Sequence, residues 1–146
     1  LALWALDFPD AAEVHGTLFA GGEPLGHRAD RVEDYAVATL TLAGGTVVRL
    51  ACSWRLHAGQ GAVIEAAFYG PNGGAAFRNR DGSFYDFTAE RMAGTDRWAI
   101  GSDAEGWGGR AAAAWAGRLA AGERFDPAAE RLVDVARVLD RIYGRG

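Results

Sequence analysis

The sequence contains no lysine, and all fifteen of its basic residues are arginine. A chain without lysine cannot supply a Schiff-base amine, a lysine general acid or the lysine of a phosphate-binding P-loop. Acidic residues outnumber basic ones by nineteen to fifteen, and a net charge of −4 gives no basic footprint for nucleic acid. We therefore expect no nucleic-acid partner, and any lysine-dependent chemistry must come from outside these residues.

Cysteine and long apolar runs are also scarce. The single cysteine, Cys52, cannot form an internal disulfide and fits a reducing compartment. No apolar run approaches the roughly 18 residues that a membrane-spanning helix needs, and no secretory signal pattern is present. These absences predict a cytoplasmic protein without a membrane partner.

Motifs for metals, cofactors and nucleophiles are missing as well. The three histidines, His15, His27 and His57, lie far apart, and none belongs to a His-x-x-x-His or Cys-x-x-Cys pattern. No Gly-x-Gly-x-x-Gly run follows a strand pattern, so the chain alone has no dinucleotide-binding turn. We expect no metal site, no cofactor bound by this chain alone and no catalytic residue within it.

What is present is a strong strand pattern in residues 34–56, where two β-rich runs flank a glycine pair. A three-residue loop, 43–45, pairs Leu40 with Val48 and keeps one face apolar, whereas a two-residue loop mixes the faces. The pattern therefore predicts a hairpin with a type I turn and a glycine in the left-handed conformation.

The remaining patterns predict an α+β fold, with an open-faced, mostly antiparallel β-sheet and helices packed on one face of it. With 146 residues, 49% of them hydrophobic, the chain is expected to form a single domain, 1–146. The other expected elements are a short helix at 1–8, strands at 13–20, 62–70, 75–79 and 83–88, an irregular segment at 94–109, and helices at 110–122 and 127–143.

The last helix is the best marked. Asp126 suits the N-cap and Pro127 the first helical position. One apolar stripe is expected to face the sheet, formed by Leu132, Val135, Ala136, Leu139, Ile142 and Tyr143.

The candidate binding residues are Trp54, Arg55 and His57. They cluster where a long strand is expected to end and a glycine-rich bend to begin, and loops at strand ends often carry function. Arg55 and His57 alternate with Leu56, so an extended strand end would direct both side chains to one side. The alternative is a solvated polar rim at a sheet edge.

An acidic pair, Glu33 and Asp34, stands at the entry to the hairpin. A general-base role would require a buried pocket beside these carboxylates. Turn-initiating acids at the start of a strand are the commoner case.

Four segments in order resemble the C-terminal domain of the glucose–fructose oxidoreductase / inositol dehydrogenase / rhizopine catabolism (Gfo/Idh/MocA) family. The opening resembles the end of that family's Asp-x-Gly-x-His helix, and the others resemble its central hairpin, its strand with a Gly-x-x-Gly element and its closing helix. In this sequence they read LALWALDFPD, VEDYAVATLTLAGGTVVRLACSW, IEAAFYGPNGGAAF and FDPAAERLVDVARVLDRIYGRG.

The resemblance implies a substrate-binding and oligomerisation domain of a NAD- or NADP-dependent oxidoreductase acting on a sugar, polyol or similar hydroxylated compound. It implies that a preceding dinucleotide-binding domain, absent from these residues, carries the cofactor and the catalytic lysine. An opening helix too short to form alone agrees with a preceding segment. The loop after the second hairpin strand, Arg55 to Gly61, would approach the substrate pocket.

The resemblance also implies a homodimer or tetramer formed through the open face of the sheet. The residues expected on that face are only mildly polar, namely Val37, Thr39, Thr41, Val47, Ala51 and Ser53. A rival interpretation is a free-standing α+β module for small-molecule binding or dimerisation without redox activity. A third is a small enzyme that uses Glu33, Asp34 or His57 as its base.

Overall fold

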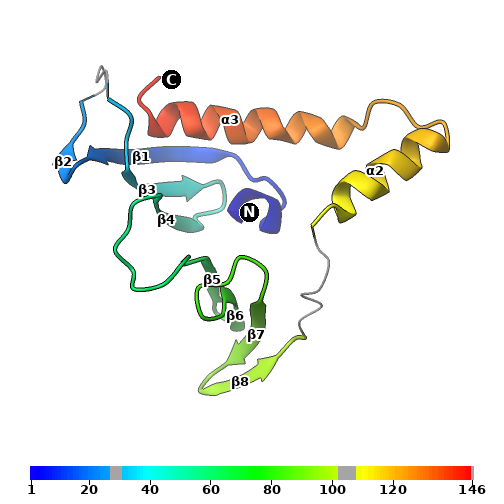
Figure 1. Cartoon of the computed structure of the whole chain (residues 1–146), viewed down its shortest axis with the longest axis horizontal. Helices are drawn as coiled ribbons and strands as arrows, with labels where there is room; N and C mark the ends of the chain where they lie inside the picture. Colours follow the sequence, from blue (N-terminus) through cyan, green and yellow to red (C-terminus); the bar gives the residue numbers. More distant parts are fainter. Residues whose placement is uncertain (27–30, 102–107, 146) are drawn as a thin grey trace. The chain divides into compact units, whose positions relative to one another are not determined.

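The computed structural model describes residues 1–26, 31–101 and 108–145. The chain divides into two compact units (Figure 1). The first unit comprises Leu1–Leu56 with Asp126–Gly146, and the second comprises His57–Phe125. Each unit contains its own four-stranded sheet.

The first unit combines a sheet with a long helix. Its strands follow the order β2-β1-β3-β4, and every neighbouring pair is antiparallel. In chain order its elements are α1 (Ala2–Ala5), β1 (Ala11–Ala20), β2 (Glu23–Pro24), β3 (Tyr35–Leu42), β4 (Val47–Ser53), a 3₁₀ turn (Pro127–Glu130) and α3 (Arg131–Ile142).

The second unit is an antiparallel meander, β5-β6-β7-β8, together with one helix. The rings of Phe77 and Phe87 stack on one of its faces, with centroids 4.6 Å apart. Its elements are β5 (Glu65–Gly70), β6 (Gly73–Asn79), β7 (Phe87–Ala93), β8 (Asp96–Ala99) and α2 (Arg110–Ala120).

The α+β class and the antiparallel pairing are confirmed, but the expectation of a single sheet is wrong. β4 ends at Ser53 and β5 begins only at Glu65, so the connection is too long for a tight hairpin. Gly59 and Gly61 lie in this connection, and Gly59 has a positive φ of 69°. β5 therefore pairs with β6 in a new sheet instead of with β4.

The predicted register of the first hairpin is confirmed, with Leu40 opposite Val48 and Ala38 opposite Leu50. The predicted turn type is wrong. Gly45 N–H donates to the Leu42 carbonyl at 3.0 Å, which closes a turn whose third residue, Gly44, has a φ of 88°. Positive φ at that position is typical of a type II turn, whereas type I requires negative φ there.

Some other boundaries also differ from expectation. β8 lies inside the segment expected to be irregular, and residues 102–107 of that segment lie outside the described residues. β7 begins at Phe87, later than the predicted strand at 83–88, and the short β2 was not predicted. Helix α2 confirms the predicted helix at 110–122 to within two residues, and it buries no residue.

The core of the first unit lies between β3 and α3. Helix α3 runs along β1 (Figure 1). Every second residue of β3 is buried, as expected for a strand with one covered face. Ala38, Leu40 and Leu42 form one cluster with Ile142 of α3. The short α1 also contributes to this core, because Leu3 and Leu6 pack against the cluster.

The start of the last helical segment is confirmed in part. The Asp126 side chain accepts a hydrogen bond from Ala128 N–H at 2.9 Å, with Pro127 next in the chain, but the first turn is a 3₁₀ helix. The predicted stripe is correct only near its end. Ile142 is buried and Tyr143 packs against the core, whereas Leu132 and Leu139 are exposed.

Among the described residues, no helix combines the length and the apolar character that crossing a bilayer requires.

Gly16 of β1 allows α3 to approach the sheet closely. A Cβ atom built at this position would lie 2.7 Å from the Ile142 carbonyl oxygen and 2.8 Å from its Cγ2. We predict that Gly16→Ala destabilises the first unit by about 1–3 kcal/mol, because the helix must shift away from β1. Chemical denaturation followed by circular dichroism measures this loss.

Gly26→Ala is the matched control, because nothing lies within 4 Å of a Cβ built there. Its effect should stay within about 0.5 kcal/mol. Equal stability of the two variants would contradict the proposed close contact.

Candidate functional site

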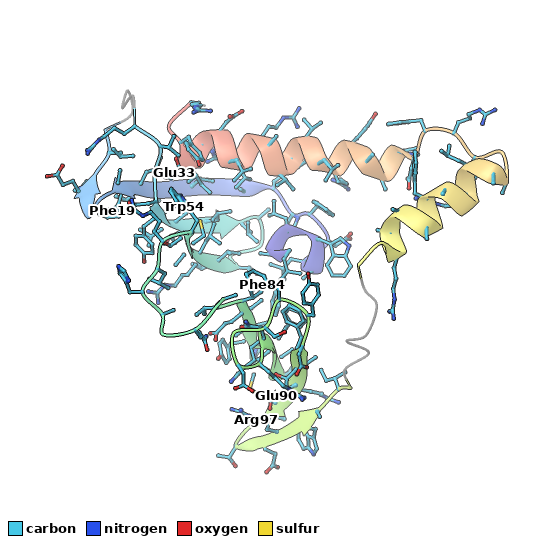
Figure 2. All side chains as sticks on the ribbon, in the orientation of Figure 1. Phe19, Glu33, Trp54, Phe84, Glu90 and Arg97 are labelled. Carbon is cyan, nitrogen blue, oxygen red and sulfur yellow. The ribbon has the colours of Figure 1, made fainter. Side chains whose placement is uncertain are left out.

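The acidic pair and the end of β4 meet at one edge of the first unit's sheet. Tyr35, the first residue of β3, pairs with Ser53, the last residue of β4. The residues before β3 therefore lie beside the residues after β4, and Figure 2 shows Glu33 and Trp54 close together at this edge. Sequence reasoning named both groups but did not predict that they touch.

Glu33 accepts hydrogen bonds from two different parts of the chain. The indole Nε1–H of Trp54 donates to the Glu33 backbone carbonyl at 2.8 Å. The hydroxyl of Tyr143, the residue after α3, donates to the Glu33 carboxylate. Glu33 thus links the end of β4 to the end of the last helix.

Asp34 is also held by contacts with several parts of the chain. Its carboxylate accepts a hydrogen bond from Gly21 N–H at 2.8 Å and forms an ion pair with Arg55 at 3.8 Å. Its backbone carbonyl accepts the hydroxyl of Ser53 at 2.7 Å. Because the Asp34 side chain is only 16% exposed and has these partners, it fits an anchoring role better than that of a free general base.

Trp54 and Arg55 together form an exposed surface, which we call the Trp54–Arg55 platform. The guanidinium carbon of Arg55 lies 5.6 Å from the centroid of the Trp54 ring, within cation–π range. Trp54 is 71% exposed even though its indole N–H is bonded. The platform therefore presents to solvent a flat aromatic ring with a positive charge over it, held by the contacts of Trp54 with Glu33 and of Arg55 with Asp34.

His57, the third predicted contact, belongs to the second unit, where it is exposed. The alternation argument for Arg55 and His57 does not apply, because β4 ends at Ser53 and both residues lie beyond the strand. The prediction that His57 joins Trp54 and Arg55 in one site stays a prediction.

Three further residues were not singled out as site residues: Gly21, Ser53 and Tyr143. Tyr143 lies 110 residues from Glu33, so no local pattern connects them. Tyr143 did belong to the predicted apolar stripe of the last helix, which was the available signal that it faces the sheet.

The pKa of Tyr143 is raised above its ordinary value. The hydrogen bond to Glu33 is the largest cause, followed by partial burial and by electrostatic interaction with Glu33 and Cys52, while Arg145 acts in the opposite direction. The guanidinium carbon of Arg145 lies 4.9 Å from the Tyr143 ring centroid. The hydroxyl therefore stays protonated, and remains a donor, at neutral pH.

The part of the chain that the structure describes contains no candidate metal-binding site. No group of three or more His, Cys, Asp or Glu side chains is arranged there to hold an ion.

No protein-family model matches the chain, and no curated protein matches its sequence. The resemblance to the oxidoreductase family therefore rests on the four sequence segments alone.

The raised pKa of Tyr143 predicts a pH-dependent contribution to stability. Folding favours the protonated hydroxyl, so the contribution is complete below the unfolded-state pKa of about 10 and declines as the pH rises through the higher folded-state pKa. Tyr143→Phe should lower the free energy of unfolding by about 1–2 kcal/mol near neutral pH. Urea titrations at neutral and alkaline pH should show that this difference shrinks above about pH 10. A pH-independent difference would contradict the hydrogen bond to Glu33.

Proposed function

We propose that this chain is the C-terminal substrate-binding and oligomerisation domain of a NAD- or NADP-dependent oxidoreductase that acts on a sugar, polyol or similar hydroxylated compound. The observation that carries the binding role is the Trp54–Arg55 platform, an exposed aromatic ring with an arginine over it. The redox role is supported by the resemblance of the four segments to the oxidoreductase family.

The platform suits a polyhydroxylated ligand. The C–H face of a sugar or polyol is apolar and can pack on the Trp54 ring, while its hydroxyl groups need hydrogen-bond partners at the edge. Arg55 supplies several N–H donors, and its side chain is 65% exposed despite the ion pair with Asp34.

Hydride transfer would depend on the nicotinamide, which supplies that chemistry when bound. This chain lacks lysine, and no sequence segment has the dinucleotide-binding pattern. In the proposal, the cofactor and the proton-transfer groups therefore belong to a separate dinucleotide-binding domain, and this chain alone binds and orients the substrate. We also place the protein in the cytoplasm, where the lone exposed thiol of Cys52 would stay reduced.

The second candidate is a free-standing α+β small-molecule-binding or dimerisation module without redox activity. The observation that favours it is the anchoring of the platform within one unit, because Glu33, Asp34 and Ser53, which hold Trp54 and Arg55, all belong to the first unit. NAD(P)-dependent turnover of a sugar by the product of the complete gene would support the first candidate. Sugar binding without such turnover would support the second.

Binding at the platform is tested with residues 1–146 and a panel of hydroxylated compounds that includes glucose, xylose, myo-inositol and glucitol. Isothermal calorimetry should detect at least one ligand. Trp54→Ala should weaken its binding by about tenfold or more, which corresponds to about 1.4 kcal/mol, because the stacking surface is lost.

Trp4→Ala is the matched control, since Trp4 belongs to the same unit and is 70% exposed, almost as much as Trp54. The Trp4→Ala variant should bind the ligand with the same affinity as the unmodified chain. Unchanged affinity in Trp54→Ala, or no binding by any compound, would contradict the proposal.

We further propose that the chain self-associates, as a dimer or tetramer, through the face of the first unit's sheet that lies opposite the buried residues of β3. Cross-strand pairs on that face include Val37 with Ala51 and Thr41 with Val47. Val47 is 57% exposed. The same face also carries Arg49, opposite Thr39, and Glu13, opposite Thr41, so the expectation of an uncharged face is wrong. A symmetric contact would use the apolar pairs and these two opposite charges in both copies.

Replacing Val37 and Val47 with glutamate should produce monomers in light scattering, because the charges would face each other across a symmetric interface. Val133→Glu, on an exposed position of α3, introduces the same charge elsewhere in the unit and should leave the assembly intact. An unmodified chain that is already monomeric at high concentration would contradict this proposal.

A further inference from the structure

Glu33 is the residue on which the orientation of Trp54 depends. It lies outside the sheet, because β3 begins two residues later at Tyr35. Its backbone carbonyl accepts the Trp54 indole N–H, and its carboxylate accepts the Tyr143 hydroxyl. The position of the carbonyl is therefore linked to the anchoring of the Glu33 side chain.

Tyr143 is a well-fixed anchor. Its own N–H donates to the Leu139 carbonyl at 3.0 Å, which continues the hydrogen-bonding pattern of α3. The residue before it, Ile142, is buried in the core, and Tyr143 itself packs against the same cluster. Arg141 donates from both of its terminal nitrogens to the carbonyls of Ala11 and Ala12, at an irregularity in β1. The hydroxyl therefore reaches Glu33 from a part of the fold that is held on several sides.

We propose that Tyr143 is a positioning residue that orients the Trp54–Arg55 platform through Glu33. Its role in ligand binding rests on the function proposed above, but its control over the Trp54 indole does not. Without the hydroxyl, the Glu33 side chain loses its partner, and the carbonyl that holds the indole becomes less restricted. A ring that must be ordered during binding binds more weakly than one already held in place, so affinity falls although no ligand contact is removed.

A purely structural role is the competing explanation. In that case the Tyr143–Glu33 bond only ties the end of α3 to the sheet, and its loss weakens the whole unit without a specific effect on Trp54. The indole N–H of Trp54 distinguishes the two roles, because it donates directly to Glu33 and gives its own signal in a ¹⁵N–¹H spectrum.

The experiment compares tryptophan indole signals in the unmodified chain and in Tyr143→Phe, with Trp54→Phe used to assign the Trp54 signal. In Tyr143→Phe, the Trp54 N–H signal should shift and exchange faster with solvent, while the other indole signals stay in place. Tyr35→Phe is the matched control: it removes a hydroxyl from the same unit, and its ring packs on Phe19 at 5.7 Å. It should leave the Trp54 signal unchanged.

Glu33 variants test the same link from its other side. Glu33→Gln keeps an oxygen acceptor for the Tyr143 hydroxyl and should retain the native Trp54 signal, whereas Glu33→Ala should reproduce the effect of Tyr143→Phe. An unchanged Trp54 signal in both Tyr143→Phe and Glu33→Ala overturns the inference. If Tyr143→Phe fails to fold, the contrast between Glu33→Gln and Glu33→Ala decides in the same way.

Ligand titrations complete the test. With a ligand that binds the unmodified chain, Tyr143→Phe should weaken binding by about three- to tenfold, and Tyr35→Phe should not. Equal affinity in Tyr143→Phe overturns the proposed role in binding. If no ligand binds the unmodified chain, a shifted Trp54 signal still supports positioning by Tyr143, and the failure then belongs to the proposed function.

Discussion

Contact between the last turn of α3 and the sheet is the constraint on which the first unit depends. Three consecutive residues make it, each with a different partner: Arg141 holds the start of β1, Ile142 fills the core over Gly16, and Tyr143 reaches Glu33. The helix therefore covers the sheet and also fixes the loop residues at its edge. A core and a candidate binding surface thus share one anchoring element.

The fold was predictable where its cause is local. Alternation of apolar residues determined the register of the β3–β4 hairpin, because a shift of one residue would expose the buried side of β3. The division into two sheets was not predictable, since strand pattern does not specify a partner for the strand that follows a long connection. β8 was missed because its four residues, DRWA, are all exposed and show no alternation.

The candidate site was likewise predictable only where its residues are placed by local sequence. Trp54 and Arg55 were found from their place near a strand end, and the acidic pair from its place before β3. Their mutual contact follows from the pairing of Tyr35 with Ser53, which the correct register already implied. Tyr143 could not be assigned to this edge, because its bond to Glu33 joins residues 110 positions apart and depends on how the helix lies on the sheet.

Cys52, the only cysteine of the chain, is exposed and stands two residues before Trp54. A thiol-reactive dye would therefore attach at a single position, two residues from Trp54 in the chain. Because tryptophan quenches many dyes on contact, emission from such a label would report when the ring is covered or turned. The chain in this way carries its own attachment point for an optical probe of the surface that it offers to solvent.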